Sequence, residues 1–343
     1  MTAFHDFGRL LRTLVKAASV LLFVPGLVIS SDSDVYRLLS VRYSEEATDG
    51  IEMEDISSLP SPEVIDQEDL IDLDHARQDW DGQILSGDND PIEWRVLPAG
   101  LMYRSYLAGE KESRFQFVPL ADLRRGLIWE TALGGRTGLL RYGTRDALKP
   151  QGWQLDLEGA VLARINPEHH DDLDAADFRA GFLSTWRDGP NAYKAGYYHL
   201  SSHVGDEFLI RNPQFDRLNY VRDSLIAGWT RDLTLDTSVY AEIALAFNYE
   251  DGAKPLELQF GTQYSPYLET GRRGAPFVAA NIHVRQDFNF VTGVNVVTGW
   301  QWRGADTNHL FRTGVQLYDG PSMQYSFVNR HETLLGGGIW FDY

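Results

Sequence analysis

GWQLDLEGAVLARI, residues 152–165, alternates apolar and polar side chains with a period of two. Successive side chains of an extended strand point to opposite faces. One face of this stretch is therefore aromatic and branched, and the other carries charged groups such as Asp156 and Glu158. A soluble sandwich would bury the apolar face, whereas a barrel in lipid turns that face outward and lines its lumen with the polar one. The stretch alone fits both architectures.

The same alternation recurs in twelve consecutive stretches between Trp129 and Tyr343. Turn-forming residues separate them, for example at 188–190 and 319–321. An even number near twelve is typical of single-chain membrane barrels. Ten or fourteen strands stay open, because 129–142 and 322–328 are the least regular stretches and Leu101–Gly109 could enter the barrel or plug it. We predict strands at 129–142, 152–165, 176–187, 193–204, 217–230, 237–248, 255–265, 276–286, 290–303, 309–318, 322–328 and 331–343.

The first 30 residues have the layout of a secretory signal peptide. Arg9, Arg12 and Lys16 precede the apolar run 17–29, and small residues follow at position 30. A membrane-spanning helix needs about 20 apolar residues, and this run is shorter and contains proline and glycine. We therefore expect export and cleavage near Ser30.

The chain closes with glycine and with apolar residues at alternating positions, ending on an aromatic residue. Gly338, Phe341 and Tyr343 carry this pattern. It resembles the C-terminal assembly signal of bacterial outer-membrane barrels. The resemblance implies an outer-membrane location, contact with membrane lipid, and recognition by the outer-membrane assembly machinery through Tyr343. Together with the signal peptide, it favours the transmembrane antiparallel β-barrel, an all-β fold, over the soluble sandwich.

The net charge of −18 is concentrated in one segment. Residues 31–94 hold 19 Asp and Glu against three Arg and no Lys, which predicts a largely disordered acidic periplasmic extension and disfavours nucleic acid as a partner. A lead-in or plug segment at 95–125 and the barrel at 126–343 follow. The Asp79–Gly82 stretch is similar to a calcium loop, but Arg77 stands where the first ligand would be. We predict no metal and no cofactor.

Applied strand by strand, the alternation places charges of both signs inside the barrel and puts Tyr198 and Leu200 on the lipid side. A twelve-stranded barrel is narrow, so such charges would pair into a cross-linked interior, unlike the lumen of a general-diffusion porin. By this strand count the loop at 206–216 faces the periplasm. The predicted lumen network, with its adjoining turn, consists of His203, Asp206, Glu207, Arg222, Glu242, His283 and Arg285.

The densest polar cluster lies around His199 and Ser201. A histidine and a serine two residues apart on a strand point the same way, about 6.5–7 Å apart along the backbone, so imidazole could activate the hydroxyl. A polar group on the adjoining strand could orient the imidazole; Asn219, Arg222 and Asp223 are the candidates.

The His-x-Ser arrangement resembles the signature of the outer-membrane phospholipase A and lipid A deacylase families, which are barrel hydrolases with a downstream Asn or Glu. The resemblance implies catalytic roles for His199 and Ser201, and Asn219 matches the third residue best. Two features depart from the families: the interval from Ser201 to Asn219 is longer, and no Asn follows the serine. Those enzymes also act from the outer surface of the barrel, whereas the alternation here turns His199 and Ser201 toward the lumen.

A broader resemblance covers residues 94–343. The segments 94–98, 103–109, 199–207 and 340–343 are similar to a bacterial domain-of-unknown-function family of exported proteins. Three functions therefore stay open. The first is a barrel of undetermined activity with a hydrogen-bonded lumen, which the alternation favours. The second is a lipid esterase that uses His199 and Ser201, and the third is a narrow substrate-specific channel.

Overall fold

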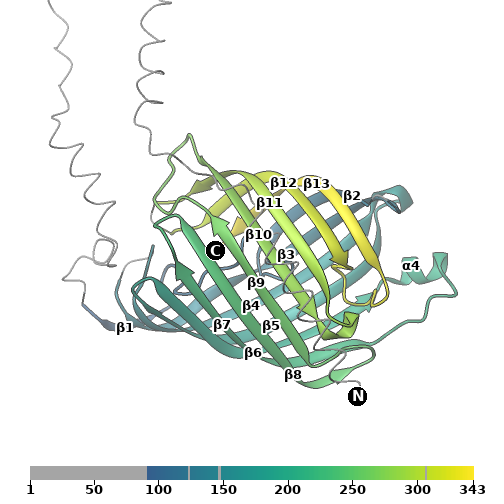
Figure 1. The fold of residues 1–343 in the computed structure, drawn as a ribbon, viewed down its shortest axis with the longest axis horizontal. Helices are drawn as coiled ribbons and strands as arrows, with labels where there is room; N and C mark the ends of the chain where they lie inside the picture. Colours follow the sequence, from purple (N-terminus) through teal and green to yellow (C-terminus); the bar gives the residue numbers. More distant parts are fainter. Residues whose placement is uncertain (1–90, 123, 146–147, 306) are drawn as a thin grey trace, which may run out of the picture. The chain divides into compact units, whose positions relative to one another are not determined.

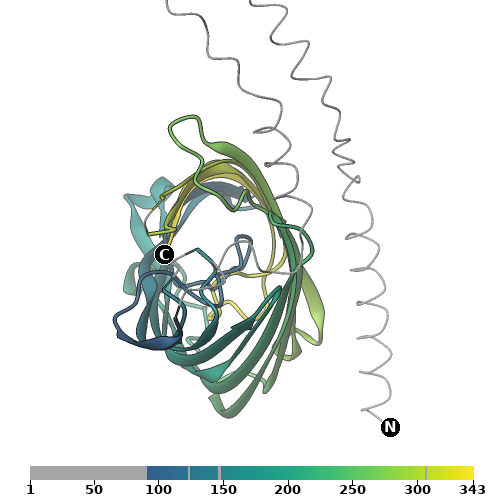
Figure 2. The same ribbon diagram turned by 90° about the vertical axis from the view of Figure 1, so that its left-hand side faces the viewer.

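The computed structural model describes residues 91–343 apart from 123, 146–147 and 306, and the following statements concern these residues. They form a closed antiparallel barrel of twelve strands with one short extra strand (Figures 1 and 2). The predicted all-β barrel and its strand number are confirmed. The predicted signal peptide and residues 31–90 of the predicted acidic extension lie outside the described residues. No helix within the described ranges is long and apolar enough to cross a membrane.

Each barrel strand pairs with the next one along the chain, and β13 pairs with β2 to close the barrel. Short turns join most strands, while α4 (Asp206–Arg211) lies in the longest connection between the twelve barrel strands, between β6 and β7. The strands are β1 (Glu93–Val96), β2 (Phe115–Asp122), β3 (Gly126–Gly143), β4 (Gly152–Asn166), β5 (Asp172–Asp188), β6 (Asn191–Val204), β7 (Tyr220–Asp232), β8 (Thr237–Glu250), β9 (Leu256–Tyr264), β10 (Ala275–Arg285), β11 (Val291–Arg303), β12 (Leu310–Pro321) and β13 (His331–Asp342).

The first strand of the wall is interrupted. β1 pairs with Leu140–Gly143 of β3, and β2 pairs with Gly126–Ala132 of the same strand, so β1 and β2 lie in line along one edge of β3. The chain between them, 97–114, leaves the wall and enters the lumen (Figure 2). Most of its side chains from Leu101 onward are buried. We call residues 101–114 the plug.

The strand number is correct because two differences compensate. β2 is a wall strand inside the range expected to be lead-in or plug, so the barrel begins at Phe115 rather than at 126. Pro119 hides this strand in the sequence, because proline within a run argues against a ladder strand. Conversely, 322–328 is not a strand. It is a loop whose side chains on both sides are buried in the lumen, which mimics alternation without forming a ladder.

The shifted strand count also reverses the direction of β6. β2 begins and β13 ends at one end of the barrel, where Phe115 pairs with Phe341. We call this the seam end. Counting β2 as the first barrel strand, β6 is the fifth, so it starts at the seam end and runs toward the opposite end. The loop with α4 therefore lies at the end opposite the seam end. The sequence count had placed this loop at the end where the chain enters the barrel.

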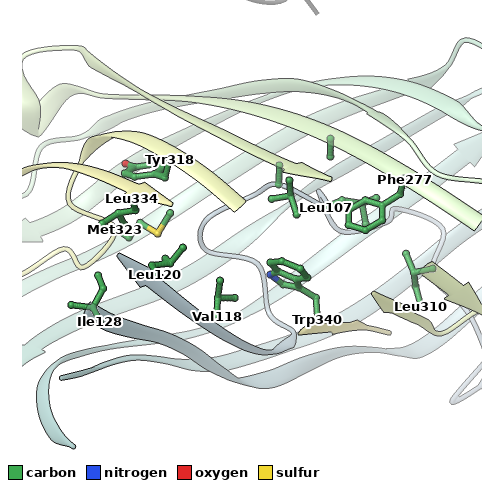
Figure 3. Close-up of a cluster of buried hydrophobic side chains, with 13 residues drawn as sticks. Leu107, Val118, Leu120, Ile128, Phe277, Leu310, Tyr318, Met323, Leu334 and Trp340 are labelled. Carbon is green, nitrogen blue, oxygen red and sulfur yellow. The ribbon is translucent and has the colours of Figure 1, made fainter. Parts of the chain in front are cut away.

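The wall is apolar outside, but its inner face is not uniformly polar. Large apolar side chains are exposed on the outer face, including Phe182, Leu225 and Leu245. Inside, the plug residue Leu107 belongs to an apolar cluster that packs between the plug and the wall (Figure 3). The lumen is therefore a filled core in which apolar packing and ion pairs alternate. The larger members of this cluster are Leu107, Val118, Leu120, Ile128, Phe277, Leu310, Tyr318, Met323, Leu334 and Trp340.

Candidate functional site

The side chains of β6 point the opposite way from the prediction. Tyr198 and Leu200 are each only 1% exposed and belong to a cluster inside the barrel. Since side chains alternate along a strand, His199, Ser201 and His203 face the outer surface. The predictions that these three line the lumen and that Tyr198 and Leu200 face lipid are wrong.

The inner face of β6 explains why the pattern misled. Tyr197 and Tyr198 are adjacent, so an aromatic residue occurs on each face of the strand. Tyr198, on the inner face, lies between two charged side chains. The guanidinium of Arg179 lies 4.0 Å from its ring centroid, and its hydroxyl donates to Glu257 at 3.1 Å. Hydrophobicity alone therefore does not determine the phase of this strand.

On the outer face, His199 meets a carboxylate from the neighbouring strand. His199 and Asp223 are direct partners in the β6–β7 ladder, and His199 Nδ1 lies 2.8 Å from Asp223 Oδ1. The side chain of His199 is 42% exposed, whereas that of Asp223 is 17% exposed. Because Nδ1 is engaged by the carboxylate, Nε2 is the ring nitrogen left to exchange a proton with another group.

Two further donors fix the carboxylate. The Tyr197 hydroxyl donates to Asp223 Oδ1 at 2.6 Å, and Asn248 Nδ2 donates to Asp223 Oδ2 at 2.7 Å. Three strands, β6, β7 and β8, thus supply groups to one carboxylate on the outer wall. Both carboxylate oxygens are engaged, which sets its orientation toward His199.

A bulge brings Asn248 into this cluster. The β7–β8 register shifts between Asp223 and Ser224, so that Asp223 faces Asn248 while Ser224 faces Ala246. The extra residue is Phe247, and both Phe247 and Asn248 are exposed. Bulges of this kind re-aim side chains and are frequent beside active sites.

Ser201 stands on the same face of β6, two residues beyond His199 and about 7 Å along the strand. Within the described residues, no hydrogen bond joins Ser201 Oγ to His199. Hydrogen bonds of catalytic groups are often long without substrate and tighten when it binds. His203 is equally far from Ser201 along the strand. Its ring centroid lies 5.8 Å from that of Phe178, and among the described residues it contacts no carboxylate.

The cluster can be compared with known proteins. The family described as "Protein of unknown function (DUF1207)" matches residues 132–343. The chain belongs to this family. The predicted resemblance to a domain-of-unknown-function family is thereby confirmed, and the match begins within β3 and covers the remaining wall strands of this DUF1207 barrel.

Solved structures similar to the DUF1207 barrel include outer membrane phospholipases and a porin. Outer membrane phospholipase A from Escherichia coli is 12% identical with a TM-score of 0.45, over 67% of this chain and 90% of that one. The calcium-bound dimer of the Salmonella typhi phospholipase gives 12% and 0.46, over 71% and 92%. The KdgM porin gives 11% and 0.38, over 67% and 99%. A search among curated proteins found no match.

Asn219, the predicted third catalytic residue, does not reach His199. It precedes β7, and its backbone N–H donates to Asp251 Oδ2 at 3.0 Å. Asp223, the alternative on the adjoining strand, occupies that place instead. Asp206 and Glu207 are exposed in the first turn of α4 and do not belong to the lumen. Across the described part of the chain, no three His, Cys, Asp or Glu side chains are grouped to hold a metal ion.

The other four predicted network residues do lie in the lumen, each with a partner. Sequence reasoning missed these partners. Glu110 and Asp287 belong to the plug and to the 3-10 turn after β10. Lys194 lies on the inner face of β6, which was predicted to face lipid, and Glu257 lies on β9. The pairs are Arg222 Nη1 to Glu257 Oε1 at 2.5 Å, Lys194 Nζ to Glu242 Oε2 at 2.5 Å, His283 Nδ1 to Glu110 Oε2 at 3.4 Å, and Arg285 Nη2 to Asp287 Oδ2 at 2.5 Å.

Proposed function

We propose that this DUF1207 barrel is an outer-membrane hydrolase of lipid esters, with its active site on the lipid-facing wall. The observation that carries the proposal is the outward His199–Asp223 pair, 2.8 Å apart, with Ser201 on the same face. In the proposed site Ser201 is the nucleophile, His199 the general base, and Asp223 the residue that orients and stabilises the imidazole.

The position of the cluster supports a function rather than a structural role. Ionisable groups that face lipid are costly, and such groups are functional candidates by default. His199 and Asp223 lie one ladder step from Phe182, Tyr197 and Leu225, which face the same surface. Two of these, Phe182 and Leu225, are among the most exposed apolar side chains of the wall.

The surroundings also favour an acyl substrate. On β5 the ladder partner of His199 is Ala180, which lies between the exposed rings of Phe178 and Phe182. On the β8 side of the cluster, the ring centroids of Phe247 and Tyr197 lie 6.2 Å apart. Apolar surfaces thus flank the polar cluster, as an ester at the boundary between headgroups and acyl chains would require.

The reaction is acyl transfer to water in two steps. Ser201 Oγ attacks the ester carbonyl carbon while His199 Nε2 accepts its proton, and the ester C–O bond then breaks as His199 protonates the leaving alcohol. Water attacks the resulting acyl-serine in the same way, which releases the fatty acid and restores Ser201. Asp223 remains ionised and stabilises the imidazolium formed in each step.

The proposal includes export and orientation. Residues 1–30 act as the signal peptide, and the C-terminal Phe341–Tyr343 segment as the assembly signal, with the α4 loop outside because outer-membrane barrels keep their longest loops there. The N-terminal mass of the mature protein tests export: a chain beginning near residue 31 is expected. An intact Met1 in the membrane fraction would contradict it.

The activity test uses the full chain in detergent with a long-chain phospholipid, and measures released fatty acid. Ser201→Ala and His199→Ala are each expected to lower the rate by about 10³-fold or more. His203→Ala is the matched control on the same face and strand, and should keep activity within about twofold. Full activity of folded Ser201→Ala, or no hydrolysis by the wild type, would overturn the proposal.

The narrow-channel alternative finds no support in the described lumen. The plug and the loop 322–328 occupy it with buried side chains, and an ion pair ties the plug to the wall, Lys111 Nζ to Asp177 Oδ2 at 2.5 Å. Single-channel recording in planar bilayers checks this point, and we expect no discrete conductance steps.

A further inference from the structure

A small cavity lies inside the barrel near its seam end, beside the plug. Its volume is about 50 Å³, and its walls include Arg104 of the plug, Thr230 of β7, Tyr267 between β9 and β10, and Arg303 of β11. A water molecule needs roughly 10–15 Å³ by this measure. The cavity therefore has room for roughly three to five waters, or for one phosphate or carboxylate group.

Cationic groups converge on one ring at this cavity. The guanidinium of Arg104 lies 3.7 Å from the ring centroid of Tyr267, Lys149 Nζ lies 4.1 Å from it, and the guanidinium of Arg303 5.7 Å. A tyrosine ring attracts a cation through its quadrupole but carries no charge. The ring therefore gathers three positive charges without neutralising them.

The carboxylate side chains in these walls, among the described residues, are already engaged by other groups. Asp232 Oδ2 is shared by Arg187 at 2.9 Å and Lys149 at 3.1 Å. Asp236 also lines the cavity, and its Oδ1 accepts the Tyr267 backbone N–H at 2.9 Å. The third such side chain, Asp342, is held by Arg312 Nη2 at 2.8 Å and by Arg114 Nη1 at 3.3 Å.

Two of the arginines have neutral partners only. Arg104 Nη2 donates to the Leu148 carbonyl at 3.0 Å, and Arg303 donates to neutral oxygens at Ser265, Pro266 and Asn308. Among the described residues, no carboxylate forms an ion pair with either guanidinium. A buried cation without a counter-charge is costly, so an anion supplied from solution would be strongly favoured here.

A buried donor atom lies at the same place. Arg104 Nε is buried without a hydrogen-bond acceptor among the described residues. Arg104 lines this cavity together with Thr230, whose hydroxyl also interacts with that of Tyr103. Burial lowers the pKa of Arg104. One oxygen-bearing anion would give Arg104 and Arg303 a charged acceptor.

We propose that this cavity binds one small oxyanion, with Arg104, Thr230 and Arg303 as its principal contacts. The limited volume admits a single phosphate or carboxylate group and excludes a lipid with its acyl chains. The site lies inside the lumen, whereas His199 and Ser201 face the outer wall toward the opposite end, so it is independent of the proposed hydrolase activity.

The test is a titration of the full chain in detergent with inorganic phosphate and, separately, with acetate. Calorimetry measures the binding of both anions, and ³¹P line broadening measures that of phosphate. Arg104→Gln is expected to weaken binding at least about tenfold, since a hydrogen bond from a charged donor is lost. Arg231→Gln is the matched control. This arginine follows Thr230 in β7 but is exposed on the outer face, and its loss should change the affinity less than twofold.

Binding of either anion that is lost in Arg104→Gln supports the site, and the preferred anion identifies its group. Binding that is unchanged in Arg104→Gln, or that depends on Arg231, would mean non-specific surface charge and would overturn the proposal. No saturable binding of either anion by wild-type protein would overturn it too. Thr230→Val, which removes the hydroxyl at similar volume, gives a second test if Arg104→Gln fails to fold.

Discussion

Arg222 and Asp223 are neighbours in β7, yet they belong to two different environments. Arg222 points inward, is fully buried, and pairs with Glu257 at 2.5 Å. Asp223 points outward and pairs with His199 at 2.8 Å on the surface that faces lipid. The inner pair has a structural explanation, because a buried charge needs a counter-charge. The outer pair balances no buried charge, and for this reason we assign it a role in the proposed site rather than in stability.

The largest effect that tests this contrast comes from Asp223→Asn. The amide keeps the shape but cannot stabilise an imidazolium, so we expect kcat to fall by about 10³–10⁴-fold. Thermal unfolding in detergent should be unchanged within about 2 °C. A large loss of stability with little change in kcat would show that Asp223 is structural, like its neighbour.

Arg222→Ala should have the converse effect. It leaves Glu257 buried without its main partner, and the free energy of unfolding should fall by about 3–5 kcal/mol. Urea unfolding in lipid vesicles measures this change. Arg222→Met keeps more of the packing and serves as a milder comparison. If hydrolysis per folded molecule also fell, the two faces of β7 would be coupled rather than separate.

The donors to Asp223 should have smaller effects. Asn248→Ala and Tyr197→Phe each remove one hydrogen bond to a charged acceptor, and kcat should fall by about tenfold. Tyr193→Phe, outward on the same strand as Tyr197 but four residues away, should leave kcat unchanged.

The smallest expected effect concerns the cations at the seam end. Burial lowers the pKa of Lys149 from 10.5 to about 8 against the attraction of Asp232. The unfolded chain therefore binds more protons between these values, and stability should rise with pH above 8, by about 1 kcal/mol per unit at most. Lys149→Met should remove this rise, which unfolding at pH 8 and pH 9 would measure.

The sequence predicted the architecture because alternation is repeated over many strands, and errors in single strands do not change the class of fold. Sequence reasoning failed where a single residue or a short segment decides how one strand is assigned. Pro119 concealed β2, and the buried loop after β12 imitated a strand. With adjacent tyrosines at 197 and 198, hydrophobicity could not decide the phase of β6, and the roles of its two faces were exchanged.

The site was predicted in part for a similar reason. His199 and Ser201 were recognisable from their spacing, which is a local property. Asp223 was one of three candidates for the residue beside the imidazole, and spacing could not select it over Asn219. The choice depends on the β6–β7 register across an intervening loop with α4. Asn248 depends in addition on the bulge opposite Asp223. Such long-range pairings have no signature in the spacing of residues along one strand.

The interrupted first strand has a consequence for how the molecule is made. The plug is tethered at both ends, by β1 and by β2, to the same edge of β3. Because both of its anchors are part of the wall, the segment that fills the lumen stays tied to the cylinder at both ends. Filling the lumen therefore needs no second molecule and no free end of the chain.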